Sequence, residues 1–123
     1  AEMGIVQYSN AELTAVDLVQ FAGHVGGLQR TATVLSELTE SLEITKMERV
    51  FPYTTTATLQ RLGYLLEFVL GEQDKSDIFY EEFKAAYPHP KRVILSNTAP
   101  EMKDAPANRW HVACNIEIEI DEI

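Results

Sequence analysis

Residues 54–71 read TTTATLQRLGYLLEFVLG, and this stretch decides the fold. Large apolar side chains recur in it at helical spacing and cover much of the helix circumference: Leu59, Leu62, Tyr64, Leu65, Leu66, Phe68, Val69 and Leu70. Burying one such side chain stabilises a fold by roughly 1.5–3 kcal/mol, so this segment should supply the main share of core burial. A helix that is apolar on most sides is contacted from several directions. We therefore predict a central helix, with its N-cap among residues 54–56 and Gly71 just past its end.

The composition places the chain among single globular domains. It has 123 residues, 46% of them hydrophobic and 24% charged, which is enough to bury a core. The formal net charge of -9 disfavours nucleic acid and anionic membranes as partners of this domain, because phosphate binding needs an excess of Lys and Arg. Two interpretations of the acidity stay open: it keeps the domain soluble, which we favour, or it attracts a basic protein partner. We expect one domain over residues 1–123.

Residues suited to catalysis or metal binding are scattered along the sequence. The single cysteine, Cys114, excludes an intrachain disulfide, and its neighbours are apolar rather than a base that would activate the thiol. The three histidines, His24, His89 and His111, lack a metal-ligand partner at the usual spacing. No Gly-x-Ser-x-Gly motif is present. We therefore expect a protein that is not an enzyme and that holds no cofactor and no metal.

Signals for membranes or export are also missing from the sequence. No apolar run approaches the ~20 residues that a membrane-spanning helix needs. The first residues lack the charged leader and apolar core of a signal peptide. The expected location is the cytoplasm.

Capping residues, periodicity and turn residues predict the remaining elements. In chain order we expect a strand at 4–8, helices at 11–22 and 28–41, a short helix that begins at Thr45–Glu48 and is ended by Pro52, a helix from Asp74 or Ser76 to Tyr87, a strand at 92–96, a loop at 97–108 and a final strand. The first helix carries a capping box, with Ser9 as its N-cap and Glu12 three residues later.

The final strand gives the clearest pattern. Apolar and polar residues alternate strictly from Trp110 to Asp121, which indicates one buried and one solvated face. The expected fold class is therefore α+β, with four or five helices packed on a small, mostly antiparallel β-sheet. As an alternative, the end of this strand extends past the domain and pairs with another chain.

Four stretches, taken together and in this order, resemble one known family. They are Ser9–Val19 (SNAELTAVDLV), Gly26–Leu38 (GGLQRTATVLSEL), Gln60–Glu67 (QRLGYLLE) and Arg109–Asn115 (RWHVACN). In this combination the chain resembles the C-terminal domain of AbiEi-type antitoxins, over most of its length from about Gly4 to Ile118.

The resemblance implies a regulatory function. Such proteins join an N-terminal winged helix-turn-helix DNA-binding domain to this C-terminal domain, and they repress their own operon. They also counter a cognate nucleotidyltransferase-like toxin, in bacterial systems linked to phage abortive infection, and the C-terminal domain is the part associated with antitoxin activity. This sequence has no winged-helix domain, so we expect DNA contact only through that missing domain. The alternative function is a protein-interaction or oligomerisation module, without antitoxin activity, that self-associates.

Polar positions of the family's motifs identify the candidate site residues. Arg30, Gln60, Arg61 and Glu67 match such positions. The interpretation that we favour is structural: Arg30 pairs with Glu67 or Asp17 across helices and fixes their packing angle. The alternative is that these side chains form a contact surface for a partner.

Overall fold

The fold is seen in a computed structural model, which describes residues 11–22, 27–96, 105–116 and 118. Its helical elements, in chain order, are α1 (Ala11–Gln20), α2 (Gly27–Leu38), the 3-10 helices η3 (Thr39–Ser41) and η4 (Ile44–Tyr53), α3 (Thr56–Tyr64), the π-helical segment η5 (Leu65–Val69) and α4 (Gln73–Ala86). The strands are β1 (Val93–Ile94) and β2 (Val112–Ala113). The strand predicted at 4–8 and the cap predicted at Ser9 lie outside the described residues.

The predicted central helix is confirmed, with its middle and its ends as expected. Thr55 is the N-cap of α3, and its side-chain oxygen accepts a hydrogen bond from the Thr58 N–H at 3.2 Å. Gly71 follows the helix with φ +70°, a conformation that glycine adopts without steric cost. The last turn is wider than an α-helix, because the Leu70 N–H donates to the Leu65 carbonyl at 2.9 Å.

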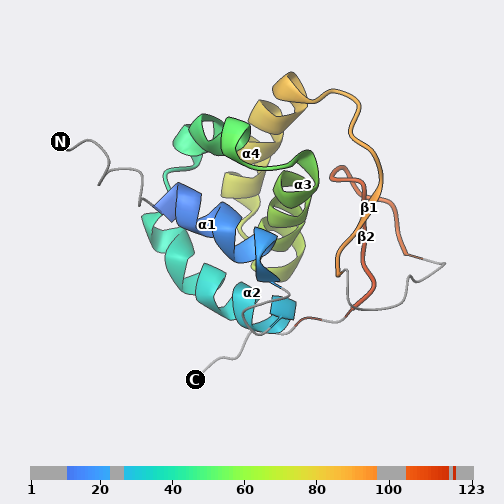
Figure 1. Ribbon diagram of the computed structural model, residues 1–123, viewed down its shortest axis with the longest axis horizontal. Coiled ribbons are helices and arrows are strands. Elements are labelled where there is room, and N and C mark those ends of the chain that lie inside the picture. The colour runs from blue at the N-terminus through green and yellow to red at the C-terminus, as the bar shows by residue number, and fades with distance from the viewer. Residues whose placement is uncertain (1–10, 23–26, 97–104, 117, 119–123) are drawn as a thin grey trace.

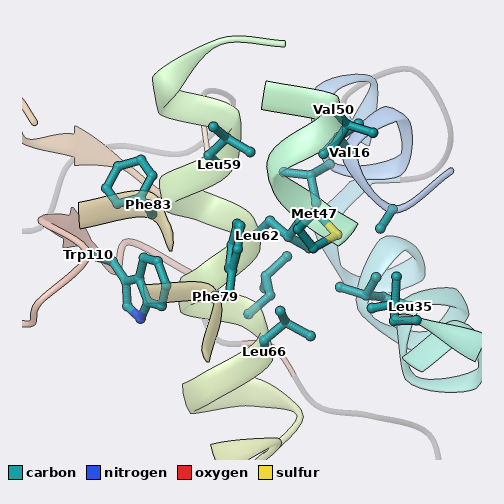
Figure 2. Packing of buried hydrophobic residues seen from close by; sticks show 14 of the residues in the cluster. Val16, Leu35, Met47, Val50, Leu59, Leu62, Leu66, Phe79, Phe83 and Trp110 are labelled. Carbon is teal, nitrogen blue, oxygen red and sulfur yellow. The ribbon is translucent and has the colours of Figure 1, made fainter. Parts of the chain in front are cut away.

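The core lies on both sides of α3. The fully buried Leu59, Leu62 and Leu66 stand between two groups of side chains (Figure 2). On one side are residues of α1, α2 and η4, and on the other side are residues of α4 and the strand segment: Val16, Leu35, Met47 and Val50 against Phe79, Phe83 and Trp110. In Figure 1 the helices accordingly surround α3, while β1 and β2 lie together beside it.

The predicted helices outside α3 are confirmed to within a few residues, but their ends differ in detail. The short helix expected at Thr45 begins at Ile44, and Pro52 lies inside its final turn instead of ending it. A residue of α1 holds the first residue before this helix, because the N–H of Glu43, the N-cap of η4, donates to the buried Glu12 carboxylate at 2.9 Å. The sequence motif around Glu12 predicted a capping role in α1 and did not indicate this contact with η4.

The predicted α+β class with a mostly antiparallel sheet is wrong. The described part of the chain is mostly helical, and its sheet is one pair of two-residue strands. The strands run parallel, with Val93 opposite Val112 and Ile94 opposite Ala113. The alternating pattern that led to the prediction identifies a half-buried segment, but it carries no information on strand direction or partner.

Among the described residues of the predicted long strand, Val112–Ala113 form the strand and an asparagine side chain takes over the pairing after them. Asn115, expected on the solvated face, is buried, and its amide makes two hydrogen bonds to the backbone of Ser96. The Ser96 N–H donates to Oδ1 and Nδ2 donates to the Ser96 carbonyl, both at 2.8 Å. Ala113, on the same expected face, is buried as well. Residues 117 and 119–123 lie outside the described residues.

A second asparagine shapes the entry to β2. The Asn108 side-chain oxygen accepts from the N–H groups of Trp110 and Val112, at 3.0 and 3.3 Å, and its Nδ2 donates to the Val112 carbonyl at 2.7 Å. The chain makes a tight turn there, with His111 at φ +56°. This turn directs the Trp110 side chain toward α3.

Trp110 is the closest neighbour of the central helix at Gly63. The indole is fully buried, and a Cβ atom placed on Gly63 would overlap its ring carbons. The aromatic rings of Phe79, Tyr80 and Phe83 surround it, with centroids 5.4, 5.3 and 5.9 Å away. Glycine at position 63 therefore gives α3 the flat surface on which the indole lies.

Replacing Gly63 by alanine tests this contact. Alanine favours a helix by about 0.5–1 kcal/mol, but its methyl group must displace the indole, and overpacking of this kind typically costs about 1–3 kcal/mol. We expect Gly63→Ala to lower the free energy of unfolding, as measured by urea denaturation.

The control for this prediction is the double variant. In a Trp110→Leu background the ring is gone, so Gly63→Ala should cost much less or become favourable. An equal cost in both backgrounds would show that the indole is not what excludes a side chain at position 63.

Candidate functional site

Three polar residues of α3 and η5, Gln60, Arg61 and Glu67, bind the C-terminal strand segment. Gln60 is 1% exposed, and its Nε2 donates to the carbonyls of Lys91 and Trp110 at 2.7 and 2.9 Å. These two carbonyls belong to the two chain segments that enter β1 and β2. One amide therefore holds both segments against the central helix.

Arg61 acts on the same strand pair one residue later. Its Nε donates to the carbonyl of Ile94 at 2.8 Å, and burial lowers the pKa of the guanidinium below its ordinary value. The Ile94 carbonyl belongs to β1, and Val112 of β2 is bonded through both backbone groups to Asn108. Side chains therefore occupy backbone groups on both strands of this small sheet.

Glu67 joins η5 to the strand segment. Its Oε1 accepts from the indole N–H of Trp110 at 2.9 Å and from Nε of Arg109 at 2.8 Å. The indole N–H thus has a partner in the core, which a buried tryptophan needs. This carboxylate is mostly buried itself, with 14% of its side chain exposed.

Arg109 extends this contact from Glu67 to the surface of α4. Its other nitrogen donates to Asp77 at 2.7 Å, and its guanidinium carbon lies 4.7 Å from the ring centroid of Tyr80. Burial lowers the pKa of Arg109, but hydrogen bonds to Asp77 and Glu67 outweigh that effect and raise it overall. The hydrogen bonds from Arg109 and then from Gln73 lower the pKa of Asp77.

The structure separates Arg30 from the other three candidate residues. Gln60, Arg61 and Glu67 lie along one continuous helical segment and contact one strand layer. Arg30 is exposed on α2. Glu67 is paired with Arg109 instead of with Arg30.

Sequence reasoning missed several polar residues of this site. Arg109 was part of a family motif in the sequence analysis but was not named as a site residue. Its partners Glu67 and Asp77 lie 42 and 32 residues away in the sequence. Asn108 and Asn115 flank the strand and fix its two ends. Short polar side chains beside a two-residue strand are the signal that could have identified them, since Asn commonly replaces backbone hydrogen bonds at turns.

Two open grooves flank the strand layer. One, of about 610 Å³, lies at the N-terminus of α3 and is lined by residues that include Thr55, Thr56, Tyr87, His89 and Lys91. The other, of about 530 Å³, is lined largely by apolar residues that include Tyr64, Phe68, Cys114, Ile116 and Ile118.

The chemistry available in the apolar groove is limited. Burial, followed by a hydrogen bond with Cys114, raises the pKa of Tyr64 well above its ordinary value, so the Tyr64 hydroxyl stays neutral near pH 7. The Cys114 thiol also donates to the Ile116 carbonyl at 3.1 Å.

Within the described ranges, no group of three or more His, Cys, Asp and Glu side chains is placed to hold a metal ion. No helix of the described part is long and apolar enough to cross a membrane.

Comparison with known families gives the class of protein. The family model of the AbiEi antitoxin C-terminal domain matches residues 1–68 of the chain. The chain belongs to this family of antitoxin domains, which is regulatory rather than catalytic. Neither a curated protein nor a solved structure matches the chain.

The matched residues end within η5. They include the motif with Gln60, Arg61 and Glu67, but not the segment Arg109–Asn115 that these side chains contact. Polar side chains within the matched residues therefore bind a strand segment that lies outside the match.

The amide of Gln60 gives a direct test of the site's structural role. Gln60→Leu keeps the volume but leaves two backbone carbonyls without their donor, and each buried unpaired group costs about 1–3 kcal/mol. We expect the free energy of unfolding to fall by about 2–4 kcal/mol, measured by denaturant titration.

Arg30→Met serves as the comparison. It removes an exposed motif residue and should change the stability by less than about 0.5 kcal/mol. Equal effects of the two substitutions would contradict the assignment of Gln60 to the packing of the strand layer.

Proposed function

We propose that this domain is the antitoxin part of a toxin–antitoxin system and that it counters a cognate nucleotidyltransferase-like toxin. Membership of the AbiEi antitoxin family over residues 1–68 is the observation that carries the proposal. We further propose that, joined to a DNA-binding domain, it represses its own operon in the bacterial cytoplasm and takes part in defence against phage. The net charge of -9 favours DNA contact through that other domain, since this one repels phosphate.

The candidate residues then divide into two roles. Gln60, Arg61 and Glu67 position the strand layer on the central helix, which is supported by their bonds to Trp110, Ile94 and Arg109. Arg30 lies exposed on α2 and is our candidate for contact with a partner. The two family motifs thus differ in role: the residues of Gln60–Glu67 maintain the fold, and Arg30 of Gly26–Leu38 is exposed for contact with a partner.

The alternative, an interaction module without antitoxin activity, is favoured by one surface feature. Phe68 is 52% exposed and stacks on Tyr64, with ring centroids 4.8 Å apart, beside the apolar groove. Exposed aromatic residues of this kind are common at protein interfaces. This alternative predicts self-association or binding of another protein through the groove.

Co-expression with the neighbouring toxin gene tests the proposed function. The toxin should arrest growth, and the domain, alone or joined to its DNA-binding domain, should restore it. We expect Arg30→Ala to weaken the rescue with unchanged thermal stability, whereas Gln60→Leu should weaken it in proportion to the loss of folded protein.

The outcomes separate the two functions. A domain that never relieves toxicity in either form is not an antitoxin. If it then forms oligomers by light scattering, and Phe68→Ser abolishes them, the interaction module is the correct function.

A further inference from the structure

The contact between α4 and η4 contains a carboxylate, Glu82, that none of the described residues neutralises. Glu82 of α4 is partly buried, and among the described residues its Oε1 atom is buried without a hydrogen-bond partner. Glu48 of η4 lies close enough to repel it. A carboxylate that loses water and gains no donor is destabilised when ionised, and a neighbouring negative charge adds to that cost.

Other charged groups on the elements packed against α4 are engaged elsewhere. On η4, Lys46 pairs with Glu43 at 2.8 Å. On α3, Arg61 donates to the backbone of β1. On η5, Glu67 is paired with Arg109. None of these groups compensates Glu82.

The other charged residues of α4 do not neutralise Glu82 either. Lys75 pairs with Glu72 at the start of the helix, at 3.9 Å. The other charged residues of α4, and the remaining one of η4, are exposed: Asp74, Asp77, Glu81, Lys84 and Arg49. Within the described part of the chain, Glu48 is thus the charged group that acts on Glu82.

We propose that the Glu48–Glu82 pair is a pH-sensitive contact, in which α4 packs more tightly against η4 once Glu82 takes up a proton. The protonated side chain no longer repels Glu48, and it gains a hydrogen with which to donate a bond. The hydrogen bonds of α3 to the strand layer are made by Gln60 and Arg61, so the device uses other residues than the site described above.

The direction of the effect follows from linkage. Burial, and next the charge of Glu48, raise the pKa of Glu82 above its ordinary value. The folded domain therefore holds this proton at a pH where the unfolded chain has lost it. The stability contributed by the proton is present at low pH and is lost as the pH rises through the folded pKa. Below the ordinary glutamate pKa of about 4.3, both states are protonated and the contribution no longer changes.

Glu82→Gln tests the proposal, because it removes the charge at every pH. At pH 7 we expect a higher midpoint of urea denaturation than for the unmodified domain, and the difference should shrink steadily toward pH 4. Comparison with the unmodified domain is essential, because Asp77, whose pKa is lowered first by the hydrogen bond from Arg109, contributes stability that is lost as the pH falls. Glu81→Gln, an exposed change on the same helix, is the matched control and should give a small difference at all pH values.

A second measurement does not depend on stability. The side-chain carboxyl carbon of Glu82, followed by NMR in the folded domain, should titrate at a higher pH than a glutamate in an unfolded peptide. Glu48→Gln should move this midpoint down. A Glu82 midpoint that equals the peptide value, or that Glu48→Gln leaves unchanged, overturns the proposal even if Glu82→Gln fails to fold.

Discussion

The close approach of the Trp110 indole to Gly63 is the contact on which the rest of the structure depends. The indole reaches the backbone of α3 because position 63 carries no Cβ atom, and it is buried between that helix and three aromatic rings of α4. Its N–H group is satisfied by Glu67, so a polar atom enters the core at little cost. One side chain thus connects the central helix, α4 and the strand segment.

Side chains replace the backbone pairing that a larger sheet would supply. Two strands of two residues cannot be stable alone. Asn115 continues the ladder to Ser96, Asn108 bonds to Val112, and Gln60 and Arg61 bind backbone carbonyls of the strand segment from the central helix. The same bonds occupy groups that an incoming strand would use, which disfavours sheet extension at Ile94 and Val112. Gln60 and Arg61 therefore attach the strand segment to α3, and the Arg61 bond also occupies a β1 carbonyl with which another strand could pair.

Features of the fold that depend on local periodicity were predicted correctly from the sequence, whereas features set by contacts between distant residues were not. Helix positions, the cap within Thr54–Thr56 and the glycine after the central helix follow from spacing and backbone preference, and these were correct. Within the described residues the strand is shorter than predicted, because Asn115 was assigned to solvent, whereas its amide satisfies buried backbone groups. Of the candidate site, the motif on α3 was identified, but the pairing of Glu67 with Arg109 spans 42 residues and leaves no periodic signal.

The bond from Gln60 to Trp110 spans 50 residues, and this separation has a consequence for protein synthesis. At ~5–20 residues per second, a ribosome needs roughly 3–10 seconds to add the residues between the two partners. During that interval the face of α3 that receives the indole has no cover. The newly made helices then expose apolar surface to chaperones and proteases. Supply of the finished domain is therefore set by translation to its C-terminal segment as well as by the rate at which its helices form.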